Sequence, residues 1–450
     1  MSFMSDNGKS VLAYCPSQLY GNVISRLCAI AMLASVGSVA AAPVLPPEME
    51  RAISAAIQTH PEVMIADSQM LSARSQVTAG GYRWYPRAEV SARTGKSGDR
   101  YSVVGLQQTL WDAGKLNADF DAAKATESAA AAGKLATLES VGMASALAYL
   151  NIARAREQLQ VAEGNVNEHQ KLHDSVVKRN GGGIGSKSDV TLATSRLQQA
   201  MASVKHWEGE LGRAEAAYVS MVGTPPADGT LPLPALWDVQ NGEQGLIAGL
   251  INRSPTLQKL REEIKVAEAA VLSKKAQLYP TLYARIDNTH YFGNGPIDND
   301  TRFSVNFEWQ NDIALTQRYQ VEAAQHMVMA ARQSLEAAER SLTESARNYW
   351  DDYITAQNRG EELSGFAISA VETVQLFKRQ FTIGRRSWPE VMNSLQDLYS
   401  ANNQKVDARY EAMASRMRIA FVSGEMDYLI GNQVAAHHQS VSAESESADK

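Results

Sequence analysis

Residues 181–188 read Gly-Gly-Gly-Ile-Gly-Ser-Lys-Ser and come close to the phosphate-binding loop G-x-x-x-x-G-K-[ST]. Ser186 replaces the second glycine of that loop, directly before Lys187. The loop binds phosphate because it follows a β-strand and opens a helix whose N–H groups point at the anion. Here a long helical pattern precedes the segment instead. We therefore expect no nucleotide binding at these residues.

His169 and His173 stand four positions apart, a spacing that puts two side chains on one face of a helix. Two imidazoles placed in this way can bind a metal ion, yet no pattern of carboxylates completes a set of ligands. We interpret the pair as part of a solvated helix face. No nucleophile and base recur together elsewhere, so the sequence predicts no enzyme, no metal site and no cofactor.

The elements that carry these residues occur twice along the chain. We predict a first structural repeat over 43–223, a proline-rich linker over 224–242 and a second repeat over 243–432. A unit of this length is a duplicated domain and not a solenoid module. The matching positions are Pro61 with Pro255, Tyr85 with Tyr279, Pro86 with Pro280, Gly183 with Gly384, Asp189 with Glu390, Leu197 with Leu398 and Gly223 with Gly424.

Composition and periodicity predict a mainly α-helical protein. Aromatic residues make up only 7% of the chain, and proline is absent from about 112–180 and from about 312–380. Each of these stretches is expected to form a helix of roughly 100 Å, at a rise of about 1.5 Å per residue. Shorter helices begin at Pro61 and Pro255, and each ends near a Tyr-Pro pair. Such long rods must pack side by side, in bundles or in an oligomer.

Strand patterns occur only at two matching places, about 87–110 and about 281–310. Apolar and polar residues alternate there, as in the run from Phe303 to Phe307. Each strand has about the 9 to 11 residues that cross a bilayer, with one face for lipid and one for water. Two hairpins of a small antiparallel sheet cannot close a pore, so several subunits are expected to share one barrel. The other interpretation is a hairpin packed on a soluble core.

Both ends of the chain are predicted to lie outside the folded part. Residues 1–42 read as a secretory signal peptide with cleavage near Ala40. Cys15 and Cys28 fall within it, so the mature protein is expected to have no disulfide. Residues 433–450 form an acidic tail that is predicted to be disordered. The formal net charge of −6 gives no basic surface for nucleic acid.

Together these features resemble the TolC family of outer-membrane channel proteins, which serve drug efflux and type I secretion. The resemblance extends from about Ala52 to Gly424. Where the first half has Gly114, the second half reads Asn311-Asp-Ile-Ala-Leu-Thr316 without a glycine. The connection from the last strand to the long helix is therefore expected to differ between the two halves. The residues that carry the resemblance are Tyr85-Pro86 and Tyr279-Pro280, the segment Gln108-Thr-Leu-Trp-Asp-Ala-Gly114, and the tips Gly183-Ile-Gly-Ser-Lys-Ser-Asp189-Val190 and Gly384-Arg-Arg-Ser-Trp-Pro-Glu390-Val391.

The resemblance implies a homotrimer in the outer membrane of a Gram-negative bacterium. Four strands per subunit would complete a twelve-stranded barrel, and twelve helices would continue it as an α-helical tunnel through the periplasm. Helices over about 187–222 and 387–423 would return from the tips of the tunnel. The implied partners are a periplasmic adaptor protein, an inner-membrane ABC or RND transporter, and outer-membrane lipid.

The resemblance also implies that the periplasmic tips close the tunnel and meet the adaptor. Carried over by position, the charged network of the aperture comprises Arg386, Glu390, Asn393 and Asp189, with Phe381 beside it. The turns expected to dock the adaptor are Gly183, Ile184, Gly384 and Arg385. A carboxylate ring that points into the lumen would favour cations over anions, although family members commonly carry aspartates where Glu390 and Asn393 stand here. The alternative is that these are ordinary solvated charges.

The predicted function is a passive exit duct of a tripartite export system. The tip Gly384-Arg-Arg-Ser-Trp-Pro-Glu-Val391 is more similar to channels of type I protein secretion than to those of drug efflux, so protein secretion is favoured. Two alternatives stay open, namely the outer-membrane component of multidrug efflux and a periplasmic coiled-coil scaffold without a pore. A scaffold would have no use for four amphipathic strands of bilayer length.

Overall fold

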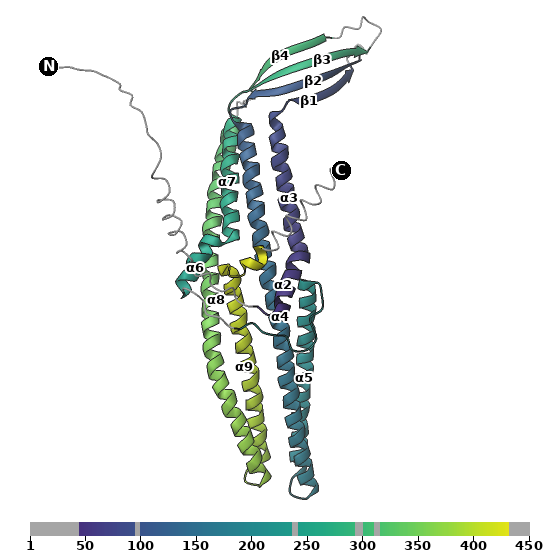
Figure 1. Cartoon of the computed structure of the whole chain (residues 1–450), viewed down its shortest axis with the longest axis vertical. Helices are drawn as coiled ribbons and strands as arrows, with labels where there is room; N and C mark the ends of the chain where they lie inside the picture. The colour runs from purple at the N-terminus through teal and green to yellow at the C-terminus, as the bar shows by residue number, and fades with distance from the viewer. Residues whose placement is uncertain (1–44, 95–99, 236–241, 293–299, 310–315, 432–450) are drawn as a thin grey trace, which may run out of the picture. The chain divides into compact units, whose positions relative to one another are not determined.

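The computed structural model describes residues 45–94, 100–235, 242–292, 300–309 and 316–431. They form a mainly α-helical protein with one small antiparallel sheet, which confirms the predicted fold class (Figure 1). The elements are α2 Pro47–Thr59, α3 Pro61–Gly81, the 3-10 turn η1 Tyr82–Trp84, β1 Arg87–Thr94, β2 Arg100–Trp111, α4 Lys115–Gly181, α5 Lys187–Val222, α6 Gly242–Arg253, α7 Pro255–Ala276, β3 Thr281–Phe292, β4 Asp300–Glu308, α8 Thr316–Thr382 and α9 Trp388–Ser423.

The elements of the first half recur in the second half in the same order. The two long helices α4 and α8 have 67 residues each, and the returning helices α5 and α9 have 36 residues each. The helices α3 and α7, which both begin at a proline, have 21 and 22 residues. The helices thus have equal or nearly equal lengths in the two halves, whereas β1 and β3 have 8 and 12 residues; the duplication itself stays a prediction.

The start of α4 is fixed by a turn and lies slightly after the predicted position. Asp112 accepts hydrogen bonds from the N–H groups of Gly114 and Leu116, at 3.0 and 2.7 Å. Gly114 has a φ of 84°, a left-handed conformation that glycine adopts without strain. The side chain of Asp112 therefore caps the helix from outside, and α4 begins at Lys115.

The four strands form one antiparallel sheet in the order β1-β2-β3-β4, at the ends of α3, α4 and α7 (Figure 1). Val90 pairs with Val104, and Ile286 pairs with both Leu106 and Phe303. These five side chains share one face, and they are exposed by 46% at Ile286 to 74% at Val90. The predicted alternation of apolar and polar residues thus gives the sheet an apolar face, which remains exposed within the described chain.

The opposite face of the sheet is polar. Arg285 bonds the carboxylate of Asp287 at 2.7 and 2.8 Å and that of Glu89 at 3.1 Å. These side chains lie across Gly105, where an added Cβ would stand 2.5 Å from an oxygen of Asp287. A glycine is needed at this position because the charged side chains occupy the space above it.

The largest apolar core lies between α2, α4, α5 and α9, and Met49, Tyr149 and Phe421 are buried in it. The hydroxyl of Tyr149 donates a hydrogen bond to the carbonyl of Pro232 at 2.9 Å. Arg156 donates to two further carbonyls of the same segment, each at 2.7 Å. The described part of the proline-rich linker is therefore held against α4.

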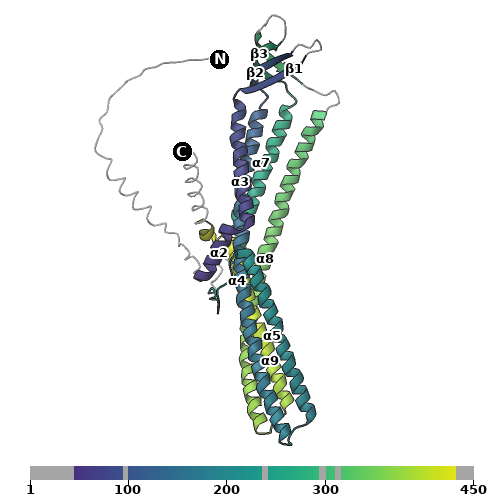
Figure 2. The same ribbon diagram turned by 90° about the vertical axis from the view of Figure 1, so that its right-hand side faces the viewer.

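The helices α4 and α5 form one hairpin, α8 and α9 form another, and the two hairpins lie side by side (Figure 2). Alanines such as Ala193 and Ala401 are fully buried at the contacts, and small side chains let helix backbones approach closely. Polar bonds join the hairpins as well. Gln158 donates to Asp407 at 2.6 Å, and Glu157 accepts from the hydroxyl of Tyr410 at 3.0 Å.

One helix of the described chain, α4, is long and apolar enough over part of its length to cross a membrane. Nearly half of this part of α4 is buried inside the protein. Alanine is frequent in this stretch, and α4 packs against α2, α5, α7 and α9. The apolar character of α4 thus serves contacts between helices.

Several predictions concern segments outside the described residues. These are the signal peptide 1–42, the tail 433–450 and the last residues of the linker. The turns between the strands of each hairpin and the segment from Asn311 to Leu315 also fall there. They stay predictions.

Glu139 of α4 is a partly buried carboxylate near the ion pair of Arg253 with Asp427. Burial, and next the negative charge of Asp427, raise the pKa of Glu139 from 4.5 to about 7, while Arg253 acts in the opposite direction. The folded protein therefore keeps a proton on Glu139 over a pH range in which the unfolded chain has released it. The free energy of unfolding should fall by up to about 1.4 kcal/mol per pH unit between these two pKa values as the pH rises.

Replacing Glu139 by glutamine should remove this part of the pH dependence. We expect Glu139→Gln to be more stable than the wild type at about pH 8 and similar to it at about pH 5, because the wild-type carboxyl is neutral only at the lower pH. Guanidinium unfolding midpoints measured across this range test the prediction. Glu163→Gln, an exposed position on the same helix, is the control. Parallel pH profiles for wild type and Glu139→Gln would contradict the assignment.

Candidate functional site

The first helical hairpin ends in a Schellman cap. The N–H of Gly183 donates to the carbonyl of Asn180 at 3.0 Å, and the N–H of Ile184 donates to that of Arg179 at 2.9 Å. Gly183 has a φ of 76°, which a residue with a side chain adopts only under strain. The tip turn is therefore fixed by the backbone itself.

The second hairpin ends in the same motif. The N–H of Gly384 donates to the carbonyl of Phe381 at 3.0 Å, and the N–H of Arg385 donates to that of Gln380 at 2.9 Å. The φ of Gly384 is 75°. Both predicted tip glycines thus occupy the left-handed position of a Schellman cap.

Each returning helix begins with a serine and a carboxylate in a capping box. The N–H of Asp189 donates to Ser186 Oγ, and the N–H of Ser186 donates to the Asp189 carboxylate, both at 3.1 Å. In the second tip, the N–H and the hydroxyl of Ser387 donate to Glu390 at 3.1 and 2.7 Å. Residues 181–188 are therefore a helix end followed by a helix start, with no strand before them.

Arg386 gathers the second tip into one cluster. Its guanidinium lies 2.6 Å from a carboxylate oxygen of Glu390 and donates to the amide oxygen of Gln380 at 3.2 Å. It also lies over the ring of Phe377, 3.8 Å from the centroid. Hydrogen bonds from Ser387, and next from Arg386, hold the pKa of Glu390 below its usual range. Two residues predicted for the aperture are thus paired within one chain.

Trp388 joins the second tip to the first. It is the first residue of α9 and is only 9% exposed. Its side chain hydrogen-bonds Asp189 of α5, and this bond, followed by those from Ser186, holds the pKa of Asp189 below its usual range. The sequence alone does not indicate a role for Trp388, because a contact between distant segments leaves no local pattern. A tryptophan inside an otherwise polar tip was the one available signal.

Further contacts join the hairpins close to the tips. The guanidinium of Arg179 lies 4.4 Å from the ring centroid of Phe381, and Lys378 forms an ion pair with Glu168. Phe381 is buried in an apolar cluster drawn from all four long helices. The members of this cluster are Leu172, Val176, Ala193, Val374, Phe381, Trp388, Val391, Met392 and Leu395.

The other predicted residues are exposed. Asn393 lies one turn further along α9 than Glu390 and points to solvent. Ile184 is 77% exposed at the first tip, and Arg385 is exposed at the second. The structure thus pairs Arg386 with Glu390 and Asp189 with Trp388, and it leaves Asn393 apart. The roles expected for these residues at an aperture and toward an adaptor stay predictions.

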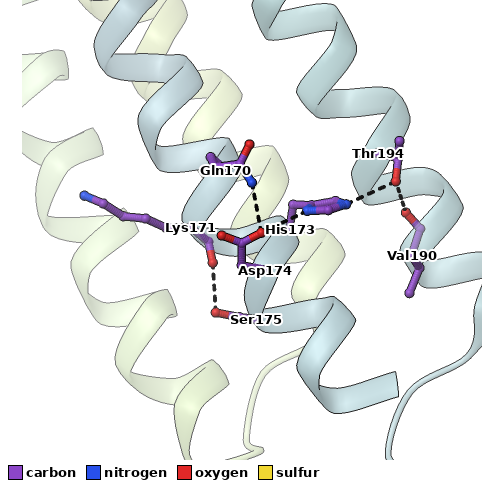
Figure 3. A network of polar contacts seen from close by, with 7 residues as sticks. All are labelled: Gln170, Lys171, His173, Asp174, Ser175, Val190 and Thr194. Carbon is purple, nitrogen blue, oxygen red and sulfur yellow. Dashed lines mark hydrogen bonds and ion pairs between the residues drawn. The ribbon is translucent and has the colours of Figure 1, made fainter. Parts of the chain in front are cut away.

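His173 bridges α4 and α5 above the first tip (Figure 3). Its Nε2 lies 3.2 Å from the hydroxyl of Thr194, and its Nδ1 lies 3.2 Å from the carboxylate of Asp174. The Thr194 hydroxyl donates to the carbonyl of Val190 at 2.8 Å, and Gln170 donates to Asp174 at 2.9 Å. This network fixes the two helices of the first hairpin to each other.

The interpretation of the histidine pair as a solvated face is wrong for His169, which is only 2% exposed. The helix α4 is covered on more than one side, by its own hairpin partner α5 and by α9 of the other hairpin. Burial, and next the positive charge of Arg196, lower the pKa of His169. Among the residues that the structure describes, no three potential ligands are grouped to hold a metal ion.

A tyrosine or tryptophan stands at the helix-facing end of every strand. Tyr85 and Tyr279 precede β1 and β3, while Trp111 ends β2 and Trp309 follows β4. All four are exposed, by 49% to 67%. Aromatic side chains with one polar atom are typical of the boundary between the hydrocarbon core and water.

Long helical hairpins joined to a short sheet with an open apolar face define the fold of an outer-membrane channel subunit. The chain belongs to the outer membrane efflux protein family, whose sequence model matches residues 52–224 and 246–425. The two matched segments correspond to the two halves described above. Membership of this family assigns the protein to the outer membrane of a Gram-negative bacterium, with its helices in the periplasm.

Known proteins resemble the chain at low identity. Outer membrane protein TolC of Salmonella enteritidis is 21% identical over 326 residues, which are 67% of this chain and 66% of that protein. Outer membrane efflux protein BepC of Brucella suis is 23% identical over 309 residues, 64% of each chain. The match thus spans slightly under two thirds of either relative. The Campylobacter jejuni CmeC outer membrane channel superposes with a TM-score of 0.76 at 13% identity, over 84% of this chain and 86% of that chain.

The tip glycines can be tested against a glycine in a helix interior. Gly384→Ala should destabilise the second tip by about 1–2 kcal/mol, because the alanine would have to keep a left-handed φ. Gly360→Ala in α8 should stabilise its helix by up to about 1 kcal/mol. An added Cβ meets no atom within 4 Å at either site, so packing does not explain the difference.

Hydrogen exchange of the tip amides measures both effects. We expect protection of the Arg385 amide to fall roughly 5- to 30-fold in Gly384→Ala and to be unchanged in Gly360→Ala. Equal protection in the two variants would show that the Schellman cap does not hold the tip.

Proposed function

We propose that this protein is the passive outer-membrane exit duct of a tripartite export system. One observation carries the proposal, namely a four-stranded sheet with an open apolar face, in which β1 and β4 are edge strands within the described chain. A sheet in lipid must close into a barrel because its edge N–H and C=O groups find no water there. Four strands are too few to enclose a channel, so further copies of the chain have to complete it.

In this proposal three copies form the duct. Their strands make a shared barrel of twelve strands, and the helices of the six hairpins continue it as a tunnel into the periplasm. The tips meet a periplasmic adaptor, and an inner-membrane ABC or RND transporter supplies the energy. Family membership supports this assembly. A periplasmic scaffold without a pore is disfavoured, because it would leave the apolar sheet face and its aromatic ends without use.

We further propose that the tips form the gate of the duct. Contacts between the hairpins, above all that of Trp388 with Asp189 and that of Arg179 with Phe381, hold the hairpins together in each chain. Opening requires the tips to separate, so these contacts belong to the closed state. The pair of Arg386 with Glu390 shapes the tip that has to move.

The gate is tested by removing one hydrogen bond while keeping an aromatic ring. Trp388→Phe deletes the indole N–H and should raise the single-channel conductance or the open probability in planar bilayers, since Asp189 loses its partner in the other hairpin. Trp207→Phe is the matched control, because Trp207 also donates from one hairpin to the other, to the hydroxyl of Tyr399 at 3.3 Å, about three helical turns further along α9 than Trp388. Equal conductance of Trp388→Phe and wild type would refute the proposed role of Trp388.

For the cargo, we propose type I secretion of large proteins. The support is the similarity of the tip from Gly384 to Val391 to channels of that class. Multidrug efflux is the second candidate, and the name of the relative BepC refers to efflux. The wall of a passive tunnel does not select its cargo, so the two candidates have to be separated in the cell.

Quantitative proteomics of the culture medium and the cell surface separates them. In a deletion strain we expect one or a few large exported proteins to disappear, and to return when the gene is restored. An unchanged set of exported proteins together with increased sensitivity to small toxic compounds would replace secretion by efflux. An unchanged exported set with unchanged sensitivity would contradict both.

A further inference from the structure

The acidic residues of the tips are already engaged within the chain. Asp189 accepts from Ser186 and from Trp388. Glu390 is held by Ser387 and by Arg386. The charge of Glu390 is therefore balanced by Arg386, whereas Asp189 keeps its negative charge but is held by neutral donors. The sequence-based expectation of a carboxylate ring that favours cations does not follow from this arrangement.

The basic residues of the tips are more numerous and mostly unpaired. The segments 178–190 and 378–390 contain seven basic residues against two acidic ones, whereas the whole chain has a formal net charge of −6. Three of the seven have partners in the structure, namely Arg179, Arg386 and Lys378. The remaining four are exposed, and none has a carboxylate within ion-pair distance in the part of the chain that is described. These four are Lys178, Lys187, Arg379 and Arg385.

Stabilisation by a helix dipole explains the positions of only two of these four basic residues. Lys178 and Arg379 lie in the last turns of α4 and α8, where the helix dipole stabilises a positive charge. Lys187 is the first residue of α5, where the same dipole disfavours a cation. Arg385 lies in the turn and forms no ion pair there. Two of the four cations are thus placed where the fold itself gains nothing from their charge.

We propose that the tips make the periplasmic entrance of the duct selective for anions. This inference rests on the proposed function, because it requires the tips to surround the entrance. Both hairpins lie side by side and end in the same kind of turn, so the four cations converge at one end of each chain (Figure 2). Three chains around one axis would repeat them three times.

The entrance is where such charges act most strongly. The tips form the proposed gate, and a narrow opening lined by charges of one sign concentrates the oppositely charged ion. At an ionic strength of about 0.15 M the screening length is about 8 Å, so the charges act across an opening of that size even if they do not point directly into it. The preferred solutes are anionic small molecules and acidic segments of exported chains.

Reversal potentials test the proposal on the full-length assembled protein. The protein is placed in planar bilayers of zwitterionic lipid, with a KCl gradient across them. We expect a reversal potential of the sign that a chloride-preferring pore gives, and a larger preference at low salt because screening is weaker there. The double variant Lys187→Glu with Arg385→Glu should shift the reversal potential toward potassium preference. Lys187→Gln with Arg385→Gln should shift it in the same direction by less.

The matched control is Arg74→Glu with Lys275→Glu. Both positions are exposed cations without an ion pair among the described residues, and they lie on α3 and α7 near the sheet. This variant makes the same change in net charge far from the tips, and we expect no shift.

Two outcomes would overturn the inference alone. These are a conducting wild type that prefers potassium, and a conducting Lys187→Glu with Arg385→Glu variant whose reversal potential equals that of the wild type. A wild-type protein that inserts into the bilayer but gives no conductance under any applied voltage would overturn the duct itself, and the inference with it.

Discussion

The close approach of the two helical hairpins is the constraint on which the rest of the structure depends. Helices of 67 residues cannot be held by apolar burial at one end alone, and some of the contacts along the long helices are made by small residues such as Ala193, between the hairpins, and Ala401, between α8 and α9. Small residues permit close approach but bury little area each. The hairpins are therefore joined by large apolar clusters near the middle and at the tips, and by polar bonds such as that of Gln158 with Asp407 in between.

At the tips, single carboxylates make two kinds of contact. Each caps the start of its own helix and also interacts with a second side chain. Asp189 caps α5 and receives Trp388 from the other hairpin. Glu390 caps α9 and pairs with Arg386. A carboxylate used in this way cannot be removed without loosening the start of its own helix. Variants at these positions would mix a change in the gate with a change in helix capping, whereas Trp388→Phe removes the indole N–H, leaves both caps intact and keeps an aromatic ring in the apolar cluster.

Much of the fold could be predicted from the sequence, because its boundaries are marked locally. Proline at the starts of α3 and α7, glycine after α4 and α8, and serine before α5 and α9 each act through the backbone of their own segment. The alternation of the strands is local in the same sense. The bond of Trp388 with Asp189 and the burial of His169 were not predictable, because they depend on which helix lies opposite, and one sequence does not contain that information.

The equal lengths of the hairpins restrict how such a protein can change. At about 1.5 Å per residue, seven residues added to each arm of one helical hairpin would move its turn about 10 Å beyond the turn of the other hairpin. The apolar cluster that joins Phe381 and Trp388 of the second hairpin to Val176 of the first would then lose its register. Lengthening is tolerated only if all four long helices grow by matching amounts. The distance that the hairpins extend into the periplasm can therefore change only if both halves of the chain change in length together.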